Sequence, residues 1–267
     1  MCKLTMLGTG NALVTKCFNS CFVVSSATTH LLVDAGGGNG ILAQLEKAGI
    51  DVGSLDGLYL THAHEDHLLG AVWIIRMMAT LMKKGKRTEK FPIYGNSHVI
   101  KALYGICRYA LAPANFEYVC ERIPLVEMSE ADSVMVGDFR LRPFDIHSTK
   151  LTQFGVEITL PGGKRLVCLG DEPYNEANRS VVEGADWLIC EAFCLYSQRE
   201  QFKPYEKHHS TALDAGRAAE SLGVRNLIIY HTEDTQLADR KRLYGAEAAS
   251  AYSGNVYVPD DLEVIEL

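Results

Sequence analysis

The stretch Thr61-His62-Ala63-His64-Glu65-Asp66-His67 decides the fold of this chain. It places four candidate metal ligands within six residues, directly after the apolar run Leu58-Tyr59-Leu60. A short apolar run of this kind indicates a buried strand, so we interpret the stretch as the tip of a strand that carries a metal site. Imidazole and carboxylate together favour zinc, manganese or iron, because calcium prefers oxygen ligands alone. The alternative is a solvated His-rich turn.

Length, charge and composition exclude some classes of function. The chain has 267 residues, 47% of them hydrophobic, which is enough for a large core in one α/β domain or two smaller ones. The formal net charge of −7 argues against a broad electrostatic grip on nucleic acid. One basic cluster, Lys83-Lys84-Gly85-Lys86-Arg87, follows a predicted helix. A solvated loop is the favoured interpretation of it, and a nucleic-acid contact is the alternative.

Eight cysteines are scattered along the chain, and no secretory signal precedes them. We therefore expect reduced thiols in a cytoplasmic protein. Cys190 and Cys194 could form half of a metal site, but buried apolar cysteines are the favoured interpretation. The most apolar stretch, residues 68–82, contains Arg76 and is too short to span a bilayer. It predicts a core helix, and no membrane association is expected.

Apolar runs bounded by turn residues predict strands, and helical spacing predicts helices. In the first half we expect strands at residues 4–7, 20–25, 30–33, 57–60 and 91–94, with helices at 41–48, 68–82 and 97–110. In the second half we expect strands at 139–146, 155–160, 164–169, 187–191 and 226–230, with a helix at 211–221. Two such halves predict two sheets packed together, with helices on their outer faces.

Three of the predicted strands in the second half end on a further candidate ligand: His147, Asp171 and His231. Taken singly, a histidine at a strand end is more often a hydrogen-bonded structural residue than a ligand. Together with the first stretch they supply the number of ligands that two divalent ions need if each keeps an open position. The candidate ligands are His62, His64, Asp66, His67, His147, Asp171 and His231.

Preceded by Asp34, this ordered ligand set resembles the signature of the metallo-β-lactamase superfamily over nearly the whole chain. The resemblance implies an αββα four-layer sandwich in a single domain of residues 1–267, with two divalent ions at one rim of the sheets. Zinc is the expected metal, and manganese and iron are the alternatives. The implied ligands are His62, His64 and His147 for one ion and Asp66, His67 and His231 for the other, with Asp171 bridging. Asp34 is implied to orient the ligand loop.

The segment His208-His209-Ser210-Thr211-Ala212 resembles the ribonuclease Z branch of that superfamily, as do Leu7-Gly8-Thr9-Gly10 and Asn19-Ser20. In that branch a histidine lies over the leaving group, and His209 is the equivalent by position. A histidine with a near-neutral pKa is a natural proton donor to an alkoxide leaving group. The alternative is that His209 only precedes a helix whose capping hydroxyls come from Ser210 and Thr211.

Other features separate the chain from particular members of the superfamily. A bridging Asp171 disfavours a true β-lactamase, and His64 disfavours the redox di-iron branch. Only 23 residues separate His147 from Asp171, and Pro161-Gly162-Gly163 among them predicts a hairpin turn, which leaves no room for an RNA-gripping arm. The acidic segment Thr232-Glu233-Asp234-Thr235 would repel a long polyanion. The sequence therefore resembles the armless phosphodiesterases of this branch.

The function expected from this resemblance is hydrolysis of a small or cyclic phosphodiester or nucleotide. A metal-bound hydroxide would attack phosphorus, Asp66 would help to aim it, and His209 would act as general acid. The alternatives are an RNA endonuclease that uses residues 83–87 as its grip, and a carboxylic ester, lactone or thioester hydrolase. Ser148 and the 193–207 segment could contact substrate, the latter through stacking, or could be structural. A homodimer is expected on the resemblance alone, and long nucleic acid is not an expected partner.

Overall fold

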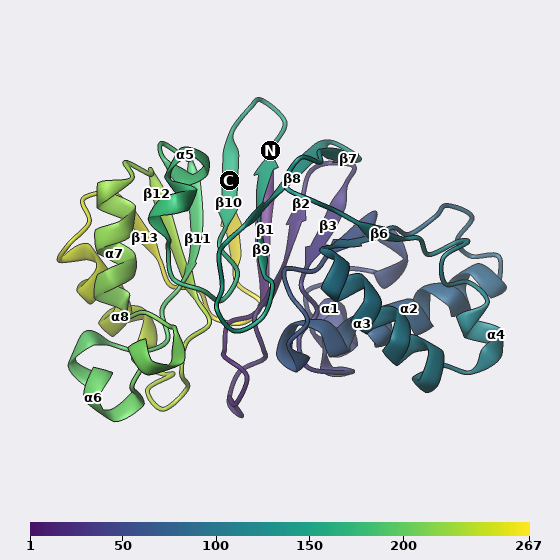
Figure 1. Ribbon diagram of the computed structural model, residues 1–267, viewed down its shortest axis with the longest axis horizontal. Helices are drawn as coiled ribbons and strands as arrows, with labels where there is room; N and C mark the ends of the chain where they lie inside the picture. Colours follow the sequence, from purple (N-terminus) through teal and green to yellow (C-terminus); the bar gives the residue numbers. More distant parts are fainter.

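The computed structural model describes residues 1–267 and contains two seven-stranded sheets that face each other (Figure 1). The first sheet consists of β14 (Val264–Glu266), β1 (Lys3–Gly8), β2 (Cys21–Ser25), β3 (His30–Val33), β4 (Gly57–Tyr59), β5 (Ile93–Gly95) and β6 (Leu125–Glu127). The second sheet consists of β13 (Asn255–Tyr257), β12 (Asn226–Tyr230), β11 (Trp187–Glu191), β10 (Arg165–Cys168), β9 (Phe154–Thr159), β8 (Phe139–Asp145) and β7 (Val134–Val136). This arrangement confirms the predicted α/β sandwich.

Helices cover the outer face of each sheet (Figure 1). The first sheet carries α1 (Gly40–Lys47), α2 (Glu65–Lys83), α3 (Ser97–Ala110) and the short α4 (Pro113–Phe116). The second carries α5 (Arg179–Val182), α6 (Arg199–Phe202), α7 (Ala212–Ser221) and α8 (Arg240–Ala249). No helix has the length and apolar character needed to cross a membrane.

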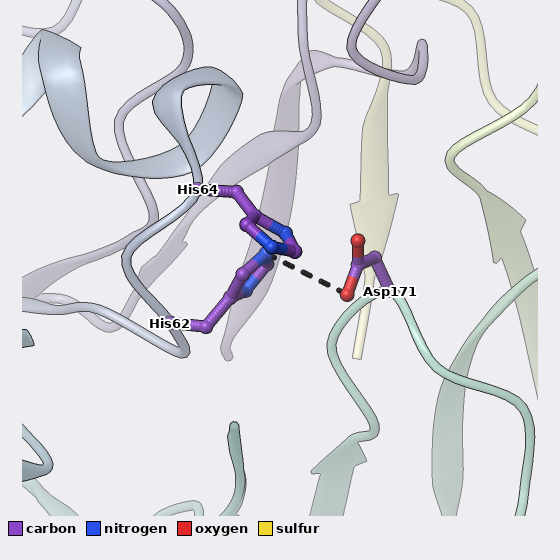
Figure 2. Close-up of side chains that lie close together, drawn as sticks. All are labelled: His62, His64 and Asp171. Carbon is purple, nitrogen blue, oxygen red and sulfur yellow. Dashed lines mark ion pairs between the residues drawn. The ribbon is translucent and has the colours of Figure 1, made fainter. Parts of the chain in front are cut away.

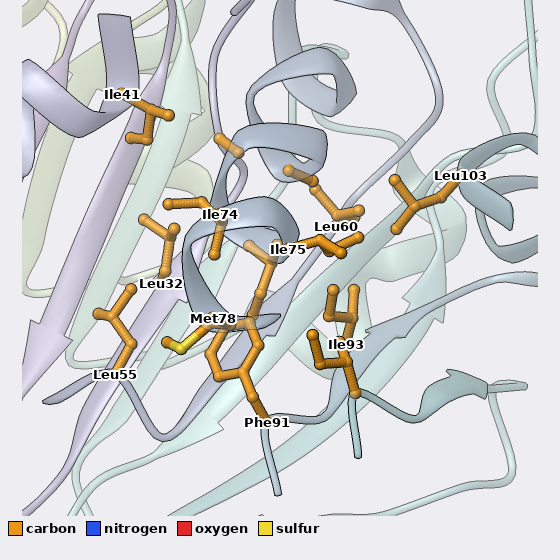
Figure 3. Close-up of a cluster of buried hydrophobic side chains, with 14 of the residues drawn as sticks. Leu32, Ile41, Leu55, Leu60, Ile74, Ile75, Met78, Phe91, Ile93 and Leu103 are labelled. Atoms are coloured by element: carbon orange, nitrogen blue, oxygen red, sulfur yellow. The ribbon is translucent and has the colours of Figure 1, made fainter. Parts of the chain in front are cut away.

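Three apolar cores hold these layers together. Between the sheets, Phe22 and Val33 of the first pack with Leu141 and Ile228 of the second. A second core joins the first sheet to α1–α3, and Figure 3 shows Ile74, Ile75 and Met78 of α2 lying over that sheet. The third core joins the second sheet to α7 and α8. Burial of apolar surface in these layers is the main force that fixes the positions of the strand ends.

The strand directions gather the functional segments at one edge. Strands β3 to β6 are mutually parallel, and so are β10 to β13. The carboxyl ends of parallel strands meet at one edge of a sheet, where ligand sites in α/β folds usually lie. Asp34 follows β3, the His62 segment follows β4, Asp171 follows β10, and His231 follows β12.

The structure differs from the predicted elements mainly at chain segments without an apolar pattern. Helix α2 begins three residues earlier than predicted, so Asp66 and His67 lie in its first turn. Helix α8 was not predicted, because its sequence Arg-Lys-Arg-Leu-Tyr-Gly-Ala-Glu-Ala-Ala has no apolar stripe. The three-residue strands β6, β7, β13 and β14 were also missed, and β14 forms only because it pairs with β1 at the other end of the chain.

All eight cysteines are free, and six of them are buried. Cys190 and Cys194 are both fully enclosed, and neither belongs to a group of side chains able to hold a metal. Both cysteines are buried, as the favoured interpretation of them as small apolar residues in a core requires.

Gly70 fixes how closely α2 approaches the β3–α1 connection. Its N–H donates to Gly36 O at 2.8 Å, and a Cβ at this position would lie 1.8 Å from Ala35 O. Gly105 of α3 is the matched control, since a Cβ there meets nothing within 4 Å.

We expect Gly70→Ala to lower the free energy of unfolding by about 1–3 kcal/mol, because backbone must shift to relieve the overlap. Gly105→Ala should raise it by about 0.5–1 kcal/mol, the helix propensity gain of alanine over glycine. Urea denaturation followed by circular dichroism measures both. Equal changes in the free energy of unfolding would show that α2 does not pack tightly against the β3–α1 connection at Gly70.

Candidate metal centre

The His62 segment forms a loop from β4 into α2. His62 is fully buried, His64 is the residue before the first turn of α2, and Asp66 and His67 follow in that turn. Figure 2 shows the His62 and His64 side chains facing Asp171, which comes from the other sheet. The loop therefore presents candidate ligands from one sheet to a carboxylate from the other.

Asp34 holds this loop through three hydrogen bonds. Its carboxylate accepts from Thr61 N at 2.9 Å, from Thr61 Oγ1 at 2.8 Å and from His67 Nδ1 at 2.8 Å. Thr61 Oγ1 in turn lies 2.9 Å from His62 Nδ1. Because the Thr61 proton goes to Asp34, its oxygen accepts the proton of His62 Nδ1. Both histidines therefore keep Nε2 free of these hydrogen bonds, and the contacts of Asp34 are those that a residue orienting the ligand loop would make. Its role in ligand orientation stays a prediction.

His231 is oriented in the same way from the opposite side. Ser20 Oγ donates to Gly10 O at 3.0 Å and lies 3.2 Å from His231 Nδ1. The serine oxygen thus accepts the Nδ1 proton and leaves Nε2 of His231 free. His231 has a φ of 57° and Asp34 a φ of 55°, left-handed conformations that non-glycine residues adopt rarely and often at functional sites.

Asp171 lies between two groups of side chains, with one oxygen toward each. Its Oδ1 is 3.6 Å from His62 Nε2, and its Oδ2 is 3.8 Å from His231 Nε2. Groups of side chains whose ligand atoms lie within 4.8 Å of one another are His62, His64 and Asp171; Asp66, His67 and His231; and Asp171, His209 and His231. The first two groups match the predicted division of ligands between two ions, apart from His147.

The donor set fits divalent metal ions. His62 Nε2, His67 Nε2 and Asp171 Oδ1 are buried and have no hydrogen-bond partner, an arrangement that costs free energy unless something else pairs with them. Burial lowers the pKa of His62 and lowers that of His231 to about 3, so both rings are neutral and able to coordinate. Burial opposes charge on His67 too, but Asp66 and Asp34 raise its pKa. A metal ion would replace that proton.

His147 is the predicted ligand that the structure does not bring to the others. Its φ is 60°, its side chain is 47% exposed, and its Nδ1 lies 3.9 Å from Asp145 Oδ2. The backbone N–H of His147 donates to Asp145 Oδ1 at 2.8 Å, and this turn directs the ring into a separate cavity of about 310 Å³. Ser148 holds the loop by donating to Glu172 Oε1 at 2.6 Å. The role of His147 as a ligand stays a prediction.

His209 lies beside the two ligand groups. Its Nδ1 is 3.5 Å from Glu191 Oε2, and neither buried atom has another partner. Burial disfavours a charged His209, but Glu191 outweighs it and raises the pKa of the imidazole. Glu191 is itself fixed by Ser210 N, which donates to its Oε1 at 2.6 Å. Thr211 caps α7 by accepting from Asp214 N, so helix capping does not use His209.

A cavity of about 550 Å³ opens onto the ligand groups. One wall is formed by residues 11–14, and the other by Phe193, Phe202 and Lys207 from the 193–207 segment. Lys150 also lines it, as do the acidic residues Glu233 and Asp234. The Lys207 ammonium lies 5.0 Å from the centre of the Phe193 ring. The cavity thus offers two cations and two aromatic rings close to the ligands.

Sequence reasoning missed several residues of this site. Glu191 ends a predicted strand on a carboxylate, the same signal that singled out Asp171, but it was not assigned a role. Thr61 and Ser20 were not recognised as partners of ligands, because a hydroxyl gives no sign in sequence of which imidazole it faces. Lys150 lies in a loop and Lys207 ends the single 3-10 turn Tyr205–Lys207, and in such short segments a sequence pattern does not fix side-chain direction.

The two sheets and their covering helices have the metallo-β-lactamase fold, and groups of histidine and carboxylate side chains at one edge of it could hold metal ions. The chain belongs to the family described as anti-Pycsar protein Apyc1, whose model matches residues 2–190. It is 26% identical over 314 residues to a ribonuclease Z of Myxococcus xanthus (strain DK1622), an alignment that covers 99% of this chain and 97% of that protein.

Two solved structures show the same fold. The metallo-β-lactamase fold protein YhfI of Bacillus subtilis has a TM-score of 0.80 at 22% identity, with 99% of this chain and 98% of that one covered. The short form of human tRNase Z has a TM-score of 0.75 at 20% identity, with 99% and 98% covered.

We expect Asp34→Ala to lower the affinity for divalent metal by about 10–100-fold, the usual effect of removing the partner that orients a ligating histidine. Chelator competition with zinc measures the affinity. Asp138→Asn, an exposed carboxylate that accepts from Ser26 and Thr28, is the control and should leave it unchanged. Wild-type affinity in Asp34→Ala would contradict the orienting role.

Proposed function

We propose that this chain hydrolyses small or cyclic phosphodiesters at a dinuclear centre, with His209 as the general acid. The observation that carries the proposal is the position of His209. One ring nitrogen faces the buried Glu191 carboxylate, and the residue shares a potential ligand group with Asp171 and His231. A proton donor beside a metal pair suits a reaction whose leaving group is an alkoxide.

The proposed ligands are His62, His64, His147, Asp66, His67 and His231, with Asp171 between the ions. Zinc is the proposed metal, because neutral imidazoles dominate the donor set. When bound, a pair of divalent ions lowers the pKa of a shared water and polarises a phosphoryl oxygen. Asp66 lies at the cavity surface, where its carboxylate can accept a hydrogen bond from the attacking water and so orient it.

His209 would deliver the proton that the departing oxygen needs. The attacking water loses one proton to solvent and its oxygen bonds to phosphorus. The bond from phosphorus to the leaving oxygen then breaks, and the His209 nitrogen remote from Glu191 gives its proton to that oxygen, to be replaced later from solvent. Glu191 stabilises the charged imidazole before transfer and keeps its Nδ1 proton in place. Phe193 stacks on the His209 ring, with centroids 5.1 Å apart and planes 19° apart, which limits rotation of the ring.

The size and charge of the cavity favour a small substrate. A volume of about 550 Å³ falls within the range of small-molecule pockets. Lys150 and Lys207 supply positive charge for a phosphate, while Phe193 and Phe202 offer faces on which a base can stack. Glu233 and Asp234 border the same cavity and would repel the continuous backbone of a long polyanion.

Ribonuclease Z relatives over the full length of the chain make RNA cleavage the second candidate. The basic cluster proposed as an RNA grip begins at the carboxyl end of α2, about 25 Å along the helix from Asp66 and His67 in its first turn. Arg87 of that cluster is buried and donates to Gly53 O and Lys90 O. The Pro161–Gly163 turn joins β9 directly to β10, so no arm extends there.

We expect His209→Asn to reduce kcat for a 3′,5′-cyclic nucleotide by about 10²–10⁴-fold, the usual contribution of a general acid. Turnover of bis(p-nitrophenyl) phosphate should fall far less, since p-nitrophenolate leaves without protonation. His208→Asn is the matched control, because His208 is exposed, lines the separate cavity, and has a φ of 55° that asparagine tolerates.

Three outcomes would count against the proposal. Equal losses on both substrates would remove the general-acid role. Metal-dependent turnover of lactones or thioesters, without phosphodiester cleavage, would favour the carboxylic ester alternative. Absence of any metal-dependent turnover in the wild-type protein would refute the proposed function itself.

Cleavage of cyclic nucleotides should be insensitive to an excess of precursor transfer RNA, and it should change little between 50 and 200 mM salt. Binding through phosphate neutralisation would instead weaken steeply with salt, by about 10³–10⁵-fold for 6–10 phosphate contacts. Replacing Lys83, Lys84 and Lys86 together by alanine should leave kcat/KM unchanged. If the wild type cleaves the RNA and this triple variant does not, the result would favour the endonuclease.

The expected homodimer and cytoplasmic location stay predictions.

A further inference from the structure

A buried arginine, Arg240, lies behind the metal centre and has no part in the chemistry proposed above. It is the first residue of α8, is 1% exposed, and is the largest side chain among those fully enclosed. A buried guanidinium is costly unless its donors are paired. The Arg240 guanidinium donates four hydrogen bonds, and their acceptors belong to segments that are far apart in the sequence.

Arg240 contacts two segments that lie next to His231, the turn after β1 and the loop after β12. Its Nη1 donates to Thr9 Oγ1 at 2.8 Å and to Thr232 Oγ1 at 3.1 Å. Its Nη2 donates to Pro259 O at 2.8 Å and to Asp260 Oδ1 at 3.3 Å. Thr232 directly follows the ligand His231, and Thr9 belongs to the turn after β1. One guanidinium therefore connects the first sheet with the loop that carries a ligand.

The chemistry of the two threonine hydroxyls requires a donor at this position. Thr9 Oγ1 already donates its proton to Asp261 Oδ1 at 2.7 Å, and Thr232 Oγ1 donates to Glu233 O at 3.0 Å. Each hydroxyl has one proton, so both present only acceptor lone pairs to Arg240. A group that is always protonated and has several fixed N–H bonds can satisfy both at once.

The Thr9 segment also reaches His231 by a second route. Gly10 O accepts from Ser20 Oγ, and that oxygen lies 3.2 Å from His231 Nδ1. The backbones pair as well, because Thr232 N donates to Thr9 O at 3.1 Å. The backbone after the ligand and the hydroxyl that fixes its ring are therefore both set by the turn that Arg240 binds.

One helical turn later, Tyr244 of α8 contacts the same loop. Its hydroxyl lies 3.4 Å from Glu233 Oε1, and the side chain is completely buried. Residues four apart share one face of a helix, so α8 holds the loop after His231 at two successive points.

We propose that Arg240 is a positioning residue for the metal centre, which sets the placement of His231 and thereby the affinity for the ion bound by Asp66, His67 and His231. The inference rests on the proposed dinuclear function. It assigns to α8, whose residues do not line the substrate cavity, the task of keeping one ligand from the second sheet in register with the ligands of the first.

The test compares Arg240→Met and Arg240→Lys with Arg242→Met. Arg242 is on the same helix, is 71% exposed, and pairs only with Asp239. Zinc titration against a chelator gives the number of ions and both dissociation constants, and thermal unfolding of the metal-free protein reports on the fold. Arg240→Met should weaken the second ion by about 10–100-fold, as loss of ligand orientation does elsewhere. The affinity of Arg240→Lys for the second ion should lie between those of Arg240→Met and the wild type, and that of Arg242→Met should equal the wild-type affinity.

The outcomes separate this inference from the proposed function. A wild-type protein that binds fewer than two ions would refute the dinuclear centre, whatever Arg240 does. Two ions in the wild type, with unchanged affinities in Arg240→Met, would overturn the positioning role. Equal weakening of both ions would also overturn it, since it indicates general loss of structure. If Arg240→Met does not fold, Thr232→Val decides. It removes the hydroxyl that accepts from Arg240 and donates to Glu233 O, and wild-type affinity for the second ion in this variant would refute the inference.

Discussion

Nε2 of His62 and Nε2 of His67 are buried near the carboxylate of Asp171 without hydrogen-bond partners, and the free-energy cost of this arrangement determines what the site can bind. Water is excluded from these atoms, so the protein alone leaves them uncompensated. In His67 and His62 the opposite nitrogen of the ring is satisfied, by Asp34 and by Thr61 respectively. Nδ1 of His231 is likewise satisfied, by Ser20. Such one-sided pairing fixes the tautomer and aims the remaining lone pair, which is the arrangement that metal coordination requires.

The architecture explains how these side chains come together at one edge of the two sheets. Asp34 and the His62 loop belong to the first sheet, and Asp171 and His231 belong to the second. The core between the sheets sets their separation, and β14 returns the end of the chain to the first sheet beside β1. Arg240 and Ser20 then tie the His231 loop across that boundary. Ligand geometry therefore depends on packing far from the ligands, as well as on their immediate partners.

Much of the fold could be predicted from the sequence, because its central strands are apolar runs with clear boundaries. The predicted strands at 30–33, 187–191 and 226–230 match β3, β11 and β12, and the predicted helix at 97–110 matches α3. Of the site, six predicted ligands come together, while His147 does not, since an Asp145 turn and the Ser148–Glu172 contact set its direction locally. Such contacts, like those of Glu191 and Arg240, join residues whose proximity exists only after folding.

We propose that two ions bind this protein, one on either side of Asp171. The most direct measurement is a crystal structure of the zinc-loaded protein with anomalous diffraction recorded at the zinc edge. A dinuclear centre should give two peaks about 3.5–4 Å apart, as in other two-metal hydrolases. One peak should lie beside His62 and His64, with His147 turned toward it, and the other beside Asp66, His67 and His231. A single peak, or peaks away from Asp171, would contradict it.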